Sequence, residues 1–484
     1  MRGSKRQKLA FWLLGLCLPT TGLLAQTNDD INSGLQFNFS TPGARSLGMG
    51  GAFLALADDA TAAFTNPAGL TNLTVGGSEF SLELRQWRYT NVFTDGGHAF
   101  GPPTGVGLDT VEGLRNGESD SEVSGISFLS LGYVLPRGFT LAFYRHELAN
   151  FQARIESAGA FVGSGERGNP LFRVFPSRSN LNLQIVNYGL SSAYELPGSV
   201  SVGAGVSFYQ LDLDSRTERY FRGEQDANGD GEVNEEDRRL SRQPGGFFGL
   251  PDFLGDNLFN IQTQEGDDTA WGVNLGVLWK INPLWSVGAA YRQGPDFDIQ
   301  SRYVYGPRGP NPGQSANPNL CSSSRTQNCL GGQGVLHVPD VYGAGVVWTT
   351  SQGKTKITLD YDRVQYSQLT QDLTNLLARE TGDFDRSNYR VRDGNEAHAG
   401  FEAILGIGSQ LVATLRLGAW YDPAHTLEYI GTDQALRARF VAGEDAIHAS
   451  SGVGLVIREN LQVDAALDLS DRVRTASISL VKFF

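Results

Sequence analysis

The C-terminal stretch from residue 461 to residue 484, LQVDAALDLSDRVRTASISLVKFF, decides the fold. Apolar and polar side chains alternate along it, and a period of two is typical of a β-strand with one apolar face. One face carries Leu461, Val463, Ala465, Leu467 and Leu469, then Ala476, Ile478, Leu480 and Phe484. The other carries Gln462, Asp464, Asp468, Thr475, Ser477 and Ser479. The chain therefore ends in strands that are apolar on one side only.

The same alternation recurs upstream, most clearly at 271–279, 357–361 and 411–421. About fourteen candidate strands follow residue 77, an even number, as bacterial outer-membrane barrels require. A soluble β-sandwich would also alternate, because its apolar faces pack against a second sheet. Periodicity alone does not separate these two folds.

The connections between the strands favour the barrel, because short turns alternate with long polar segments, as they do at the two rims of outer-membrane barrels. Aromatic residues near the predicted strand ends are typical of interfacial girdles: Trp87, Tyr89, Trp279, Trp285 and Tyr421. The sequence predicts an all-β fold, a transmembrane antiparallel β-barrel of about 14 strands over 76–484, with long extracellular loops. The short turns lie at 136–138, 197–199, 282–283, 352–353, 406–409 and 459–460. The long segments are 94–121, 153–180, 219–267, 303–336, 371–393 and 424–445.

Both ends of the chain carry features of an exported protein. Residues 1–25 have a basic start, a short apolar run and Leu-Leu-Ala before Gln26, the pattern of a secretory signal peptide. A lipid anchor at Cys17 is disfavoured, since Leu16 stands where a lipoprotein signal needs a small residue. The terminal Phe484 resembles the signal read by the barrel-assembly machinery of the bacterial outer membrane. Lys482 interrupts that face, although near a rim its ammonium can reach the interface.

Charge and composition exclude other classes of protein. The formal net charge is −13 and no basic run stands out in the mature part, so we expect no nucleic-acid binding. No mature segment reaches the roughly 18 uninterrupted apolar residues that a membrane-spanning helix needs.

Residues 26–75 precede the strands and do not alternate. Within them, 35–75 read LQFNFSTPGARSLGMGGAFLALADDATAAFTNPAGLTNLTV. The Gly-Gly-Ala, Asp-Asp-Ala and Asn-Pro-Ala elements, in this order before the first strand, resemble the plug of the FadL family of outer-membrane transporters for long-chain fatty acids and other hydrophobic compounds. The resemblance implies an N-terminal plug, or hatch, domain and passive uptake of hydrophobic small molecules.

The Asn66-Pro67-Ala68 element falls on the plug motif of that family. Proline fixes φ and keeps Asn66 out of the α region, so a defined bend is expected there. Its role is either to shape the plug or to contact ligand. Because the barrel lumen is expected to be polar, the apolar plug residues are candidates for the ligand pocket: Leu47, Met49, Phe53, Leu54, Leu56 and Phe64.

The resemblance also brings an alternative function, because FadL-like barrels include shuttle and attachment components of the type IX secretion system, which bind proteins. An apolar cluster in the 219–267 loop either forms an entrance groove for ligand or packs on its neighbours. Its residues are Phe247, Phe248, Leu250, Phe253, Leu254, Leu258 and Phe259.

The same loop contains the spacing of an EF-hand calcium loop, with Gly231 at the sharp turn and Val233 two residues later. Position 12 is Asp in place of the usual Glu, as in dockerin-type loops, which this run resembles. A solvated acidic turn is the alternative. The sequence therefore predicts Ca²⁺ as a cofactor, with the side-chain ligands Asp226, Asn228, Asp230, Glu232 and Asp237.

Cys321 and Cys329 share the 303–336 loop and are expected to form a disulfide in an exported protein. A metal site at these thiols is disfavoured, since no histidine or second cysteine pair lies nearby.

Signals for an enzyme are weak. Residues 44–48 nearly match a nucleophile elbow, and Gly48-Met49-Gly50 resembles the start of a dinucleotide fingerprint, with Phe53 where a third glycine belongs. Neither has the required strand-turn-helix context, so we expect no enzymatic activity. The lumen-facing charges are expected to form a hydrated wall: Asp360, Asp362, Asp464, Asp468, Arg292 and Arg416.

Overall fold

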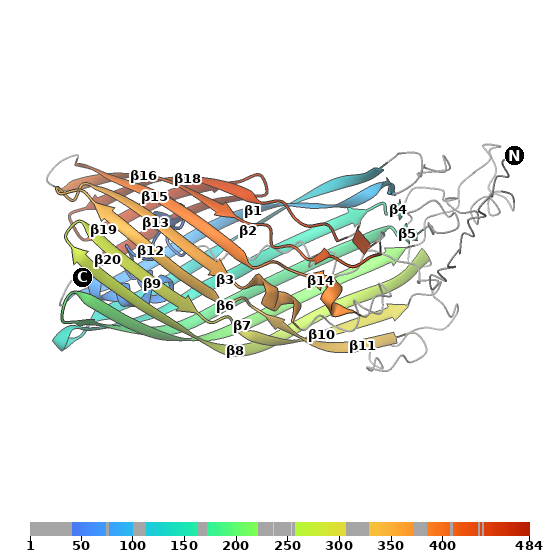
Figure 1. Ribbon diagram of the computed structural model, residues 1–484, viewed down its shortest axis with the longest axis horizontal. Coiled ribbons are helices and arrows are strands. Elements are labelled where there is room, and N and C mark those ends of the chain that lie inside the picture. The colour runs from blue at the N-terminus through green and yellow to red at the C-terminus, as the bar shows by residue number, and fades with distance from the viewer. Residues whose placement is uncertain are drawn as a thin grey trace, which may run out of the picture.

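The structure is a computed structural model. It describes residues 41–73, 77–99, 113–162, 172–220, 236, 253, 257–305, 329–371, 385–406, 410–433, 436–437 and 440–484. A single antiparallel sheet closes on itself into an elongated barrel, because the last strand pairs with the first from Glu79↔Phe483 to Tyr89↔Val473 (Figure 1). The predicted antiparallel β-barrel is confirmed.

The wall has fourteen strands, as predicted. Two of them are interrupted: β9 continues as β10 after Gln293–Pro295, and β11 continues as β12 after Val338–Asp340. Proline lacks the N–H that a ladder needs, which explains both interruptions. The strand bounds are β1 Ser78–Ala99, β2 Gly113–Val134, β3 Phe139–Ser157, β6 Ser177–Leu196, β7 Val200–Tyr220, β8 Leu258–Asn282, β9 Trp285–Arg292, β10 Asp296–Tyr305, β11 Cys329–His337, β12 Val341–Thr349, β13 Thr355–Val364, β15 Gly394–Gly406, β16 Leu411–Asp422, β18 Ala446–Ile457, β19 Leu461–Leu469 and β20 Val473–Phe483.

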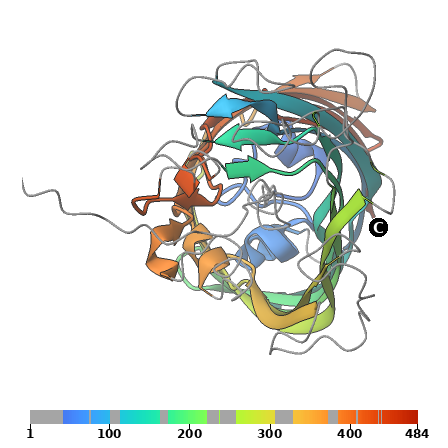
Figure 2. The same cartoon turned by 90° about the vertical axis from the view of Figure 1, so that its right-hand side faces the viewer.

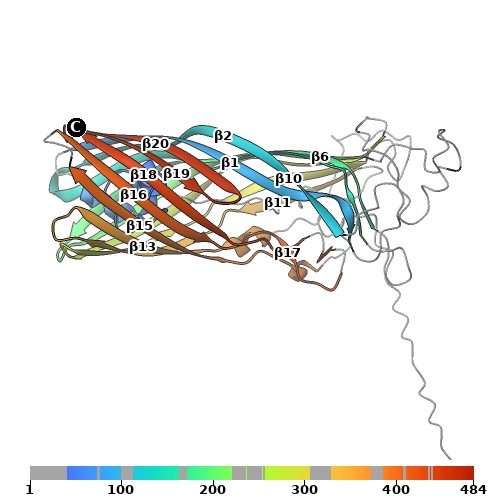
Figure 3. The same cartoon turned by 90° about the horizontal axis from the view of Figure 1, so that it is seen from above.

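The short turns gather at one end of the barrel, where η2 (Pro136–Gly138) joins β2 to β3. At the other end β1 to β8 continue well past β16, β18 and β19, so the wall is taller on one side (Figure 3). Small elements stand at that tall end: β4 (Ala160–Val162), β5 (Phe172–Val174), η5 (Tyr366–Thr370), η6 (Arg386–Asn388), β14 (Tyr389–Arg390) and β17 (Glu428–Tyr429).

Outward-facing side chains are apolar around the turn end of the barrel. Trp271, Leu359 and Ile478 are each at least half exposed, whereas Thr358 and Ser477 on the inner face are buried. In the long strands this pattern inverts toward the loop end, where Arg88, Glu122 and Glu156 point outward. The inversion marks the edge of the apolar belt, so the tall side of the wall projects beyond it.

The inversion corrects one expectation about the aromatic girdle. Trp279, Trp285 and Tyr421 point outward as predicted, but Trp87 and Tyr89 are only 6% and 7% exposed and point into the barrel. Above the belt the outer face of β1 meets water, so its aromatic residues turn toward the lumen.

The plug segment occupies the lumen at the turn end (Figure 2). It consists of the short helices α2 (Ala44–Leu47) and α3 (Ala62–Thr65) and the 3₁₀ helix η1 (Pro67–Asn72), joined by turns. Among the described residues, no helix is long and apolar enough to cross a membrane.

Candidate functional site

Glycines of the wall allow the plug to lie directly against the strands. A Cβ on Gly276 of β8 would come within 2.0 Å of Asn66 Oδ1, and one on Gly418 of β16 within 2.1 Å of Gly50 N. The same holds for Gly203 against Ala68. No side chain fits at these positions, because real Cβ atoms do not approach so closely. The high glycine content therefore has a role in docking the plug, which the sequence did not reveal.

Asn66 is fully buried and joins three parts of the structure. Its Oδ1 accepts a hydrogen bond from Ala68 N at 3.2 Å, which begins η1 after the extended conformation imposed by Pro67. Its Nδ2 donates to Leu54 O at 2.8 Å and to Val277 O of β8 at 3.2 Å. The side chain thus shapes the plug and fastens it to the wall.

A buried ionic network fastens the other side of the plug. Arg45 contacts Asp58 at 2.6 Å and Glu402 of β15 at 2.9 Å, and Lys356 of β13 lies 3.0 Å from Asp58. Burial opposes ionisation of Asp58, but Arg45 and Lys356 outweigh it and lower the pKa of this carboxyl. The stabilisation that the ionised Asp58 carboxylate gives the folded protein is therefore present above the usual Asp pKa of about 3.9. It is lost as the pH falls through the lowered pKa of Asp58.

Wall charges that were expected to line a hydrated pore instead support the plug. Arg416 bridges Glu402 at 2.8 Å and Asp464 at 2.7 Å, and Asp360 accepts a hydrogen bond from Leu54 N at 2.7 Å. The plug fills this part of the lumen and supplies partners for Asp360 and Glu402, while Arg416 is held by carboxylates of the wall itself.

Directly beyond the plug, a belt of apolar wall side chains lines the lumen, so the plug residues are not alone as candidates for a ligand pocket. Phe53 packs with Met49, Ala55 and Leu56 against Val347 of the wall. Phe64 lies on the side of the plug that faces the loop end of the barrel, which we call its upper surface, and its ring is 4.2 Å from that of His146. The wall then continues the apolar lining with Phe128, Tyr144, Phe151, Leu181, Leu183, Ile185, Leu211, Leu213, Phe297 and Ile299.

The wall next to Phe128 and His146 is not closed by a complete ladder. Pairing of β2 with β3 runs only from Phe128↔His146 to Val134↔Thr140. In contrast, β1 stays paired with β2 up to Gly113, and β3 with β6 up to Ser157. We call the unpaired stretch between Gly113–Ser127 of β2 and Glu147–Ser157 of β3 the β2–β3 seam.

Irregular backbone flanks the seam on both sides. Register shifts occur at Glu83/Leu84 between β1 and β2, and at Glu147/Ala149 between β3 and β6. Such bulges bend strands and end regular pairing. Isolated hydrogen bonds replace the ladder, including one from Ser119 Oγ to Arg154 O at 2.6 Å. The seam should therefore open more easily than the rest of the wall.

The outer surface beside the seam is hollowed. A depression of about 950 Å³ begins at Gly125 and Ile126 of β2 and extends across β1, β20, β19, β18 and β16. Its lining is mostly apolar and includes small residues such as Gly452 and Ala466. The lower end of the seam thus meets an apolar surface.

Several predicted sites lie outside the described residues: all five predicted calcium ligands, Cys321, Phe247, Phe248, Leu250 and Leu254, together with the side chain of Cys329. Phe253 is described. Its ring is 5.2 Å from that of Tyr220, and the Arg178 guanidinium lies 4.0 Å from its centroid, so this residue packs on the loop-end rim. The disulfide and the calcium loop remain predictions.

Comparison with protein families matches residues 177–475 to the family described as outer membrane protein transport protein (OMPP1/FadL/TodX). The chain belongs to this family. Its members are outer-membrane β-barrels that transport hydrophobic compounds, which places the protein in the bacterial outer membrane. The FadL resemblance inferred from the plug motif is confirmed.

Solved structures agree with the fold. A Pseudomonas aeruginosa FadL homologue has a TM-score of 0.57 at 14% identity, covering 92% of this chain and 99% of that chain. The toluene transporter TodX of P. putida scores 0.51 at 14% identity, covering 92% and 99%. The CymD monoaromatic hydrocarbon channel scores 0.50 at 17% identity, covering 93% and 99%. The comparison with curated protein sequences finds no match.

Proposed function

We propose that this protein conducts hydrophobic small molecules, long-chain fatty acids among them, passively from the outside into the outer membrane. The observation that carries the proposal is the position of the β2–β3 seam. The seam begins at Phe128 and His146, next to Phe64 on the upper surface of the plug. An apolar solute that descends the lumen meets the plug and the end of the β2–β3 ladder at the same height.

The chemistry of the lumen supports this route. The side chains of the belt directly beyond the plug are apolar and packed on one another, so a solute crosses it by displacing them and exchanging one apolar contact for another. Below that level the plug blocks a straight path to the periplasm with buried ionic groups, which an apolar solute does not enter readily. Leaving through the seam brings the solute to the exposed apolar side chains of Leu84 and Ile126 on the outer surface.

Uptake in a host without its own transporter tests the proposal. Cells that express the intact protein should take up labelled oleate or toluene down its concentration gradient, with saturation at high concentration and without an energy source. Changing Leu183, an inward residue of the apolar lining, to Asn should slow uptake by about tenfold, since a buried amide without a partner costs about 1–3 kcal/mol. Ser179→Asn on the same strand face is the control. Two results together would replace the transport function with the secretion function. These are that no apolar solute enters the host cells, and that deleting the gene from its own organism abolishes surface delivery of secreted proteins.

The outer loop supplies a second part of the proposal. Calcium at Asp226, Asn228, Asp230, Glu232 and Asp237 would order the 219–267 loop, and the apolar residues after it would receive solute at the tall rim. The position of Phe253 against Tyr220 and Arg178 supports an apolar contact there. Calorimetry should show Ca²⁺ binding at about 10⁻⁴ to 10⁻³ M, as in extracellular modules. Unchanged heats in a variant with Asp226→Ala and Asp230→Ala would exclude the site.

A further inference from the structure

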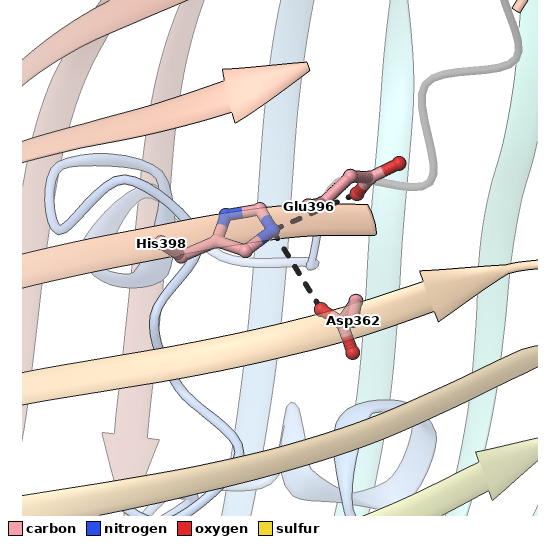
Figure 4. A group of neighbouring side chains, drawn as sticks. All are labelled: Asp362, Glu396 and His398. Atoms are coloured by element: carbon pink, nitrogen blue, oxygen red, sulfur yellow. Dashed lines mark ion pairs between the residues drawn. The ribbon is translucent and has the colours of Figure 1, made fainter. Parts of the chain in front are cut away.

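Asp362, Glu396 and His398 lie together on the inner face of the barrel, at the contact between the wall and the plug (Figure 4). The register of β13 and β15 sets Asp362 opposite Glu396, with His398 two residues along the same face. One ligand atom of each side chain falls within 4.8 Å of the others. His398 Nε2 is 3.7 Å from Asp362 Oδ2 and 3.6 Å from Glu396 Oε2.

The orientation of the His398 ring is fixed from two sides. Its Nδ1 lies 2.7 Å from the Gly50 carbonyl of the plug, and its face stacks on Trp420 with centroids 5.3 Å apart. A carbonyl only accepts hydrogen bonds, so Nδ1 carries a proton, and in the neutral ring the Nε2 lone pair faces the two carboxylates. A metal-binding histidine typically has this arrangement, donating its other N–H to a carbonyl.

The facing atoms lack partners although they are buried. The side chains of His398, Asp362 and Glu396 are 10%, 13% and 9% exposed. His398 Nε2 has no hydrogen bond, because its separations of 3.6 Å from Glu396 Oε2 and 3.7 Å from Asp362 Oδ2 exceed hydrogen-bond length; the second oxygen of Asp362, Oδ1, is also buried without a partner. Glu396 uses Oε1 to accept from Tyr366 at 3.0 Å, leaving Oε2 directed at His398. Two buried carboxylates and a lone pair directed at one another require a cation.

We infer that these three side chains bind one divalent metal ion of the zinc type. An imidazole nitrogen with two carboxylate oxygens is a ligand set for Zn²⁺, with bonds of about 2.0–2.2 Å. Ligand atoms around a tetrahedral ion lie about 3.3 Å apart, so the 3.6 and 3.7 Å separations of the carboxylate oxygens from His398 Nε2 need to contract only slightly. Calcium fits poorly, since it takes about 6–8 oxygen ligands.

The surroundings have room for an ion. A cavity of about 30 Å³ is bounded by the three side chains, by Gly50 and Leu54 of the plug and by Arg292. This is space for a single ion or water molecule. Bound metal would make the His398 Nδ1–H a stronger donor to Gly50 O, so the ion would tie the Gly50 turn of the plug to β15.

Zinc binding to the purified, chelator-stripped full-length barrel tests the inference. We expect one equivalent of Zn²⁺ by calorimetry and by elemental analysis, and a visible absorption band of tetrahedral Co²⁺ when cobalt replaces zinc. His398→Ala should lose both signals, and Asp362→Asn should weaken zinc binding about tenfold or more, on the scale of lost support at a metal site.

The matched control is His448→Ala. His448 stacks on the other face of Trp420 at 3.9 Å and lies 2.7 Å from Asp468, so its removal disturbs the same aromatic stack without removing a proposed ligand. This variant should keep the zinc and the cobalt band. The inference is overturned if the wild type binds no stoichiometric metal, because a proton on His398 is then the cation. It is also overturned if His398→Ala binds zinc as tightly as the wild type.

Discussion

Uptake of apolar solutes should fall by about tenfold or more when the β2–β3 seam is cross-linked, because each tenfold loss requires only about 1.4 kcal/mol of added barrier. Gly125 and Glu147 are suitable positions, since a Cβ on Gly125 would lie 3.6 Å from Glu147 Oε1 across the seam. A protein with Gly125→Cys and Glu147→Cys, in a background without Cys321 and Cys329, would be joined by a short reducible reagent. Reduction should restore uptake in the same sample.

A second cysteine pair controls for the chemistry. Ser179 and Thr217 face each other in the complete β6–β7 ladder, with their hydroxyl oxygens 3.0 Å apart. Joining cysteines at these positions should leave uptake unchanged, because that part of the wall is already closed. Full uptake through the cross-linked seam would contradict the lateral route and would favour exit past the plug.

Deletion of the plug should convert the protein into an open channel for small ions. Without residues 41–73, Glu402 loses Arg45 and Asp360 loses the Leu54 N–H, and water would replace the plug around these charges. Conductance in planar bilayers should rise toward that of a porin, while saturable uptake of oleate falls because solute is no longer stopped beside the seam.

The control for this deletion is Leu54→Ala, which trims one apolar side chain and keeps every backbone contact of the plug. It should remain closed to ions. Heat-modifiable migration on a denaturing gel would verify that the deleted form still makes a barrel. A folded deletion protein that stays closed to ions would show that the wall, and not the plug, blocks the lumen.

The alternation of side chains, together with the pattern of short turns and long loops, was sufficient to predict the barrel and the outward face of most strands. At 271–279 and 461–469 one face of each strand contacts lipid and the other faces the lumen, so apolar and polar side chains alternate with a period of two. The pattern was misleading at Trp87 and Tyr89. Above the belt, apolar side chains point into the lumen and polar ones point outward, and this reversed arrangement has the same period of two. A single sequence does not show where along a long strand the outer solvent changes from lipid to water.

The plug contacts and the candidate metal site could not be predicted. Asp362 and Glu396 are neighbours only through the register of two strands separated by a long loop, which alternation leaves unspecified. Gly276 and Gly418 resemble ordinary strand glycines until the plug is placed against them. The Asn-Pro-Ala element marked the plug correctly, although the bonds that Asn66 makes to Leu54 and Val277 depend on the tertiary fold.

The attachment of the plug has a consequence for the order of folding. Arg45 pairs with Glu402, which lies 357 positions further along the chain. Asn66 donates a hydrogen bond to Val277, which lies 211 positions away. These contacts arise only after nearly the whole polypeptide is available, so the N-terminal segment emerges first and docks among the last. Loop-closure entropy makes such distant pairings slow. Once β20 pairs with β1, the wall surrounds the plug, and a plug still outside could enter only through an open end of the barrel.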